Sequence, residues 1–283
     1  GKSKLVLETI AAQRFEHPQI LLVPEHATHE AELDLCRALG DTASRDGEVL
    51  RFQSLATRVL SQTGGISDIT LDNGGKILIM RRALQEVSSY LTVFSKPSQR
   101  PAFLRELVAL ADELYAYKIA PSLLLQQVQD IPGAAGDKLR STALLFGAYD
   151  ARLHGGDFDA RSKVQKLCDK LPNSDYLLGK DIYIDGFSYF NRTEEDIIAT
   201  ALKQANSVTV TLLGDDSDPQ LFRNGIQQRE RLRRLAKDAG CSCEVENLVR
   251  NGDTAFSHLE RYFLGAEKAW TGSTPAITLY QGN

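Results

Sequence analysis

The hydrophobic pattern of the first part of the chain alternates between helix and strand. Residues 4–13 carry recurring apolar side chains without a helix breaker, so the pattern predicts a helix. Residues 19–24 form a short aliphatic run closed by Pro24, which is typical of a strand buried on both faces. A helix over residues 30–39 and a strand around residues 49–52 follow. This alternation is the order of a parallel α/β domain.

The pattern changes between residue 71 and residue 171, where strand signals disappear. Apolar residues recur at three- and four-residue steps, for example over residues 103–114 and 139–153. This spacing is that of amphipathic helices packed on one face. Proline and glycine break the pattern near Pro97 and Pro132. We therefore predict an all-helical insertion over residues 71–171, forming a distinct subdomain.

The α/β pattern resumes after the insertion. Residues 181–187 are predicted to form a strand, and residues 207–213 form a second, strongly β-branched one. A helix over residues 193–205 lies between them, with Thr193 or Asn191 as its N-cap. The sequence thus predicts that the parallel sheet continues on both sides of the helical insertion.

The last part of the chain contains a basic helix over residues 220–239 and a final strand over residues 276–280. Either a solvated face or a contact with DNA or a partner subunit would explain the cations of this helix. They are Arg229, Arg231, Arg233, Arg234 and Lys237. The predicted organisation is a first α/β part over residues 1–70, the helical insertion over 71–171, and a second α/β part over 172–283.

Composition narrows the class of protein without identifying it. The chain has 283 residues, of which 42% are hydrophobic and 25% charged, as in an ordinary globular protein. Its net charge of −4 offers no global attraction to nucleic acid, so any DNA binding must come from a local patch. No apolar run approaches the roughly 20 residues that span a bilayer. The four scattered cysteines do not form a disulfide framework, which fits a cytoplasmic protein.

The first three residues, Gly1, Lys2 and Ser3, match the end of a phosphate-binding loop and stand directly before the first predicted helix. In such a loop the lysine neutralises the terminal phosphates, and the serine hydroxyl is a ligand of Mg²⁺. Backbone N–H groups at the start of the helix hold the anion. We expect the chain to begin partway through this motif. Chance is the alternative, because three residues are a short match.

A second signal completes a nucleotide–magnesium site. Asp185 closes an aliphatic strand in the manner of the aspartate that holds Mg²⁺ in phosphate-loop proteins. The alternative is a strand that simply ends in an Asp-Gly turn. The next residue is Gly186, where a motor that hydrolyses ATP normally carries glutamate. Glycine cannot orient or deprotonate an attacking water molecule. The sequence therefore predicts an ATP and Mg²⁺ site at Gly1, Lys2, Ser3 and Asp185, with Mg²⁺ at Ser3 and Asp185, and little or no hydrolysis.

Several further segments carry a family resemblance. Residues 23–28 (VPEHAT) resemble the V-P-E-Q-x-T segment of the AddB/RexB subunit of bacterial ATP-dependent helicase–nucleases. Residues 52–60 (FQSLATRVL) are similar to the next motif of that family, F-x-x-L-A-x-R-V-L. Residues 184–187 match its I-D-G-F, and residues 208–212 with 221–223 are similar to the strand and segment that follow. Order and spacing agree over nearly the whole chain.

The resemblance implies that the chain is the N-terminal part of a much larger protein. Its fold would be an α/β, RecA-like P-loop NTPase domain, namely domain 1A of a superfamily 1 helicase, interrupted by a helical domain 1B. The family works as a heterodimer with an AddA/RexA-type helicase–nuclease and processes double-strand DNA ends for recombination. Its nuclease domain, with an iron–sulfur cluster, would lie beyond this chain. No catalytic residue or cluster ligand is therefore assigned, and the chain is not expected to be active alone.

The resemblance also implies a surface for single-stranded DNA. In helicases of this type the segments matching residues 24–28 and 53–58 face the single strand, and their polar side chains suit phosphate contacts. The candidates are His26, Thr28, Gln53, Ser54 and Arg58. The alternative is that these are ordinary loop and helix residues. A metal site at His26 and His29 would lack a third ligand.

Two functions remain open at this stage. One is a DNA-binding, helicase-like component of a DNA-end-processing enzyme, with single- and double-stranded DNA as partners. The other is a protein-interaction scaffold that keeps a degenerate RecA-like fold only to dock the partner helicase subunit. A small-molecule kinase is disfavoured, because a long helical insertion precedes the magnesium strand and no lid with paired arginines is recognisable.

Overall fold

The fold is described from a computed structural model of the chain. It describes residues 1–65, 71–94, 100–154, 162–216, 219–248, 254–262, 270–273 and 278.

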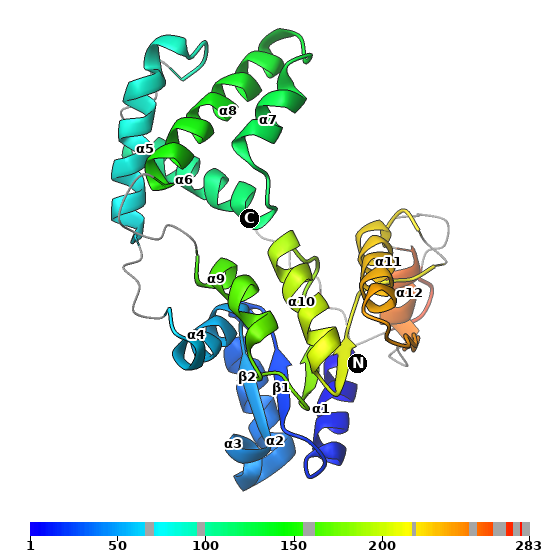
Figure 1. Ribbon diagram of the computed structural model, residues 1–283. Coiled ribbons are helices and arrows are strands. Elements are labelled where there is room, and N and C mark those ends of the chain that lie inside the picture. The colour runs from blue at the N-terminus through cyan, green and yellow to red at the C-terminus, as the bar shows by residue number, and fades with distance from the viewer. Residues whose placement is uncertain are drawn as a thin grey trace.

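A parallel four-stranded sheet forms the centre of one part of the molecule, with the strand order β2-β1-β3-β4 (Figure 1). All three neighbouring pairs run parallel. Each strand falls within or beside a segment predicted from the sequence, so the α/β class with a parallel sheet is confirmed, and it is consistent with a RecA-like fold. The strands are β1 (Gln19–Leu22), β2 (Gly47–Leu50), β3 (Asp181–Ile184) and β4 (Ser207–Val210).

One face of the sheet is covered by α1 (Lys2–Gln13) and α2 (Thr28–Leu39). Successive side chains of a strand point to opposite faces, and Leu21 and Tyr183 are on the face that meets these helices. Both strands are buried along their whole length, as the unbroken aliphatic runs predicted. The short α3 (Ala43–Asp46) lies between α2 and β2.

The opposite face packs against three other helices, which gives the sheet helices on both sides. Ile20, Leu22 and Ile184 lie in one buried cluster with Leu55 and Leu167. The helices on this face are α4 (Phe52–Thr63), α9 (Lys163–Lys170) and α10 (Arg192–Gln204). Short 3₁₀ turns also occur at η1 (Glu25–Ala27), η2 (Gly40–Thr42), η3 (Ser88–Tyr90) and η5 (Leu171–Asn173).

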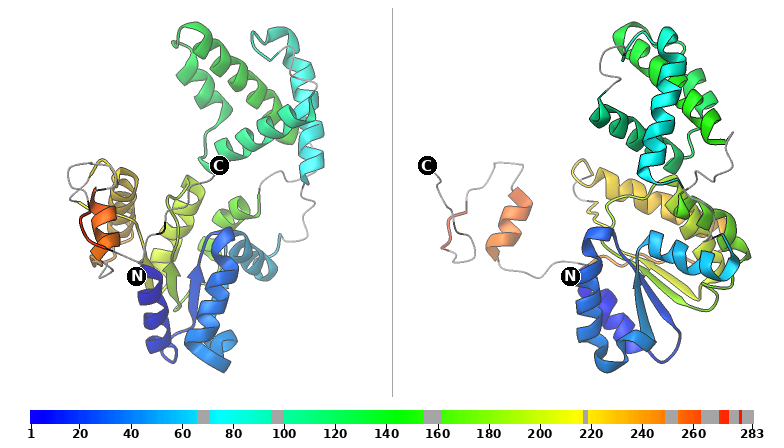
Figure 2. Two further views of the ribbon diagram at one scale, coloured as in Figure 1. Left: turned by 180° about the vertical axis from the view of Figure 1, so that it is seen from behind. Right: turned by 90° about the vertical axis from the view of Figure 1, so that its left-hand side faces the viewer.

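Four helices form a second body, which we call the helical subdomain. Figures 1 and 2 show it standing apart from the sheet. Its buried cluster, which includes Met80, Leu107 and Tyr149, is separate from the two clusters on the sheet. Its members are α5 (Asn73–Val87), α6 (Pro101–Ala116), α7 (Pro121–Val128) and α8 (Gly133–His154). The predicted helical range 71–171 also includes α9, whose Leu167 lies in the core beside the sheet.

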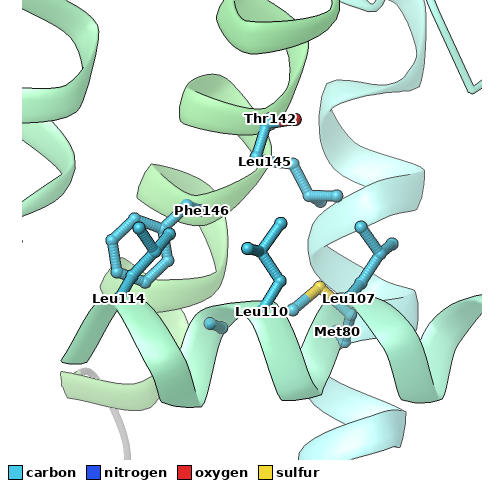
Figure 3. Close-up of a pocket in the computed structure, with 8 residues that line it drawn as sticks. Met80, Leu107, Leu110, Leu114, Thr142, Leu145 and Phe146 are labelled. Carbon is cyan, nitrogen blue, oxygen red and sulfur yellow. The ribbon is translucent and has the colours of Figure 1, made fainter. Parts of the chain in front are cut away.

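An apolar hollow opens between α5, α6 and α8 in the helical subdomain (Figure 3). Leu110 of α6 projects into the space between the other two helices, opposite Met80 and Leu145. The side chains that line it are Met80, Leu107, Leu110, Ala111, Leu114, Thr142, Leu145 and Phe146. The lining carries no titratable group, so the hollow is a gap in the helical core.

The remaining helices are α11 (Arg223–Asp238), the predicted basic helix, and α12 (Thr254–Tyr262), which stands away from the sheet in Figure 2. Within the described residues, no helix combines the length and apolarity needed to cross a bilayer. All four cysteines are free. The strand predicted over residues 276–280 falls, apart from Thr278, outside the described residues.

Candidate functional site

The carboxyl ends of the parallel strands form one edge of the sheet, and the candidate residues gather there. Strand pairing extends one residue past β1, β3 and β4. The N–H of Val23 donates to the Leu50 carbonyl at 3.0 Å, and the N–H of Asp185 donates to the Leu22 carbonyl at 3.0 Å. The N–H of Thr211 likewise donates to the Ile184 carbonyl at 2.9 Å. Residues that follow the strands are therefore fixed beside one another.

Asp185 stands at the centre of this edge and is buried, with 8% of its surface exposed. The hydroxyl of Thr211, at the end of the neighbouring strand, donates a hydrogen bond to its Oδ1 atom. Among the described residues no lysine or arginine forms an ion pair with this carboxylate. A buried carboxylate needs hydrogen bonds or a cation to offset lost hydration, so Asp185 is suited to face a cation.

Lys2 begins α1 and is half-buried beside Asp185. Burial lowers the pKa of the Lys2 ammonium, and the negative charge of Asp185 opposes that lowering. An electrostatic effect of this kind requires the two groups to be near one another. Lys2, from the start of the chain, therefore lies within electrostatic reach of Asp185, from the second α/β part.

Gly1 and Ser3 flank Lys2 and are exposed. Gly1 is the N-cap of α1 and its helix has no side-chain cap, so backbone N–H groups of the first turn remain open to a ligand. The Ser3 hydroxyl lies in this first turn. A helix N-terminus with an adjacent lysine is an arrangement that favours a phosphate anion.

These residues fit a nucleotide with Mg²⁺ in their chemistry. The carboxylate of Asp185 and the hydroxyl of Ser3 are oxygen ligands, which Mg²⁺ prefers. Within the described part of the chain, no group of three or more His, Cys, Asp or Glu side chains could hold a metal ion. Mg²⁺ commonly keeps water and substrate phosphates in its coordination shell, so a site with few protein ligands suits it.

Gly186 follows Asp185 in a conformation that other residues adopt with difficulty. Its φ angle is +82°, in the left-handed region. A Cβ atom placed on Gly186 would lie 3.3 Å from Cδ of Pro24, at the end of the neighbouring strand. The backbone itself therefore disfavours any side chain where a hydrolytic carboxylate would stand.

The candidate DNA-binding residues of the first loop lie directly after β1. His26 is exposed in η1. The hydroxyl of Thr28 donates to the carbonyls of Pro24 at 3.2 Å and of Glu25 at 3.1 Å, which holds the start of α2 in place. Thr28 therefore has a structural role at this turn, whereas His26 is open to a ligand.

The second loop begins α4 beside the first. Gln53 is exposed and Ser54 half-buried in its opening turn. Arg51, just before the helix, forms an ion pair with Glu25 of the first loop. His26, Gln53 and Ser54 thus belong to two loops that are tied together at the carboxyl edge.

Arg58 lies apart from these loops. It is well inside α4, which runs back from the carboxyl edge, and its guanidinium forms an ion pair with Glu48 of β2 at 2.7 Å. Glu48 also accepts a hydrogen bond from the Tyr176 hydroxyl at 2.9 Å. This network gives Arg58 a structural role in joining α4 to the sheet.

The basic helix α11 uses several of its cations within the molecule. Arg229 pairs with Asp216 at 2.8 Å, and Arg231 pairs with Glu195 of α10 at 3.3 Å. Arg233 pairs with Glu230 of the same helix at 3.3 Å. These contacts favour the interpretation of the cluster as a mostly solvated, internally paired face.

Sequence reasoning missed Thr211 and Pro24, which respectively hold Asp185 and close the space beside Gly186. The parallel register offered a signal for the first. Ile184 pairs with Val210, so the residues that follow them, Asp185 and Thr211, must be neighbours. No sequence signal reveals that Pro24 lies close to the Cβ position of Gly186. That distance depends on how the residues after two neighbouring strands are placed in space.

We predict that Gly186→Ala lowers the free energy of unfolding by more than Gly179→Ala. Gly179 has a φ angle of +69° and open space around its Cβ position, so both variants incur the cost of a left-handed alanine, about 1–2 kcal/mol. Only Gly186→Ala also contacts Pro24. Urea unfolding of both variants measures the difference, and equal losses would show that Pro24 yields without cost.

Comparison with known proteins places this chain in a family. The family model described as "ADDB, N-terminal" matches residues 1–260. The chain is similar to proteins named as the B subunit of an ATP-dependent helicase/deoxyribonuclease. That of Desulforamulus reducens is 32% identical over 93% of this chain and 25% of the relative, and that of Clostridioides difficile is 32% identical over 93% and 24%. That of Geobacillus thermodenitrificans is 28% identical over 99% and 26%, so the chain spans about a quarter of these curated relatives. With a model match over most of its length, this chain belongs to the ADDB N-terminal family.

Proposed function

We propose that the chain is the helicase-like N-terminal region of the B subunit of an ATP-dependent helicase/deoxyribonuclease, acting in the cytoplasm in double-strand DNA end processing and recombinational repair. The name of the relatives supports the proposal, although it describes proteins about four times as long. The observation that carries it is the match of the ADDB N-terminal family model to residues 1–260, and the position of Asp185 at the carboxyl edge of a parallel sheet, within electrostatic reach of Lys2, supports it.

In this proposal the sheet with its covering helices corresponds to domain 1A of a superfamily 1 helicase, and the helical subdomain corresponds to domain 1B. The separate buried clusters support that division. Along the sequence, the helical subdomain follows α4, and the sheet part resumes after α8 with α9.

The proposed nucleotide site binds ATP with Mg²⁺ and hydrolyses little of it. Lys2 and the first turn of α1 would hold the phosphates, while Ser3 and Asp185 would hold the cation. When bound, ATP would supply the phosphate charges that Lys2 and the first turn of α1 could hold, and Mg²⁺ would supply the cation that Ser3 and Asp185 could hold. Gly186 leaves no general base after Asp185, and its positive φ angle, with Pro24 close to the Cβ position, supports the absence of that group as a property of the backbone.

The proposed DNA surface is the pair of loops that carry His26, Gln53 and Ser54. Their exposure and the ion pair between Arg51 and Glu25 support a preformed surface. The protein would act with an AddA/RexA-type helicase–nuclease partner on single- and double-stranded DNA. An iron–sulfur cluster and a nuclease centre would belong to other parts of the protein.

We predict that Lys2→Ala weakens the binding of a fluorescent ATP analogue with Mg²⁺ by about 10–100-fold. A hydrogen bond to a charged group contributes about 1.5–3 kcal/mol. Lys4→Ala is the matched control, because Lys4 lies on the same helix and pairs with Glu8 on its exposed face. Titration in the presence of Mg²⁺ measures both. Equal affinities, or no binding by the unaltered chain, would support the scaffold that only docks a partner.

We predict that the double variant His26→Ala with Gln53→Ala weakens binding to a mixed-sequence single-stranded oligonucleotide several-fold. Each lost hydrogen bond costs about 0.5–1.5 kcal/mol. Arg58→Ala should change the affinity less, because its guanidinium is engaged by Glu48. Fluorescence anisotropy over a salt series measures the affinities, which should fall with rising salt. A larger loss with Arg58→Ala than with the double variant would contradict the placement of the surface.

A further inference from the structure

The end of α6 in the helical subdomain contacts the start of α10 beside the sheet (Figure 1). The hydroxyl of Thr193 donates a hydrogen bond to the backbone carbonyl of Ala116 at 2.9 Å. Lys118, just past α6, forms an ion pair with Asp196 of α10. We call these four residues the joint. They connect two bodies whose buried cores are separate.

Thr193 is anchored on both sides of the joint. It is buried, with 3% of its surface exposed. Its own carbonyl accepts a hydrogen bond from Sγ of Cys168 in α9 at 3.3 Å. Asn191, not Thr193, caps α10, in a capping box with Glu194. The Thr193 hydroxyl therefore does not cap α10, and it bonds to the helical subdomain instead.

Lys118 occupies a backbone position that normally suits glycine. Its φ angle is +55°, and α6 ends there with the N–H of Lys118 donating to the Tyr115 carbonyl and that of Ile119 to the Leu114 carbonyl. This pair of bonds defines a Schellman ending, in which the left-handed residue is usually glycine. A lysine at this position adds backbone strain. Its side chain forms an ion pair with Asp196, which glycine could not form.

A short, packed segment leads from Asp185 to the joint. After Gly186, the ring of Phe187 packs edge-on against Phe52, with 5.4 Å between centroids. The Phe187 ring also packs, in a tilted arrangement, against Phe190 at 5.3 Å. Asn191 then begins α10. Phe52 opens α4 after β2, and a Cβ atom at Gly186 would lie 3.3 Å from Pro24 after β1, so this segment lies close to the ends of three neighbouring strands. A change in the loop after Asp185 can therefore be transmitted to Thr193 through these packed side chains.

We propose that the joint sets the orientation of the helical subdomain relative to the sheet and couples that orientation to the loop that follows Asp185. The coupling is a property of the free chain and does not depend on nucleotide binding. Through this coupling, a change in the loop at the carboxyl edge alters the orientation of the helical subdomain. A rearrangement at Gly186 would move α10 and, through Thr193 and Lys118, the end of α6.

The orientation is measured as a distance between spin labels on the two bodies in the full chain. Cys36 on α2 and an introduced Arg82→Cys on α5 are both exposed positions. Cys241→Ser and Cys243→Ser remove competing thiols. Cys168 is retained, because burial raises the pKa of its thiol to about 11 and leaves little reactive thiolate.

The joint is severed by Lys118→Gly with Thr193→Val. Glycine suits the left-handed ending of α6, so this change removes the ion pair without a backbone penalty. The control is Lys76→Met, which removes the ion pair to Asp112 within the helical subdomain. We expect the severed joint to broaden the distance distribution and the control to leave it unchanged. An unaltered distribution in the severed variant would overturn the proposal.

Coupling to the loop is tested by Gly186→Ala against Gly179→Ala, which places the same strain before β3, beside the end of α10 opposite the joint. We expect Gly186→Ala to shift the distribution when the joint is intact and to add nothing once it is severed. Gly179→Ala should have no effect in either background. Equal effects of the two alanine variants, or an undiminished shift without the joint, would overturn the coupling. Circular dichroism confirms that each variant is folded.

Discussion

The parallel pairing of β1 with β3 is the constraint on which the candidate site depends. It aligns Leu22 with Ile184 and so places Asp185 beside the residues that follow β1. The same register places Thr211 beside Asp185 from the other side, where its hydroxyl holds the carboxylate. Once these strands are paired, α1 brings Lys2 to the same edge. The site is thus a consequence of sheet register, because no local motif contains both charged residues.

The close approach of Pro24 to the Cβ position of Gly186 leaves little room for a side chain after Asp185. Gly186 and Pro24 follow adjacent strands, and a Cβ atom at residue 186 would lie 3.3 Å from Cδ of the proline ring. A substitution at residue 186 would therefore require the proline ring to shift by a few tenths of an ångström. In the proposed nucleotide site, this geometry accounts for the lack of a group to activate water after Asp185. Glycine at position 186 fits both the packing beside Pro24 and the absence of a hydrolytic carboxylate.

Much of this fold was readable from the sequence, and the limits have physical causes. The aliphatic run ending in Pro24 predicted β1, and the run ending in Asp185 predicted β3, since strands buried on both faces must be apolar throughout. The helical range was also evident from its periodicity. Tertiary partners were not readable. The sequence could not show that Arg58 turns to Glu48, or that Thr193 bonds to α6 while Asn191 caps its helix.

The central claim is that Lys2 and Asp185 lie within electrostatic reach of one another, and the pKa of the Lys2 ammonium tests it most directly. Burial should hold this pKa below the usual 10.5, and the nearby carboxylate should oppose that shift. Nuclear magnetic resonance titration of labelled lysine side chains in the unaltered chain and in Asp185→Asn would measure both effects. Loss of the negative charge should lower the Lys2 pKa further. An identical Lys2 pKa in the two proteins would contradict the account, because it would place the two groups out of electrostatic reach.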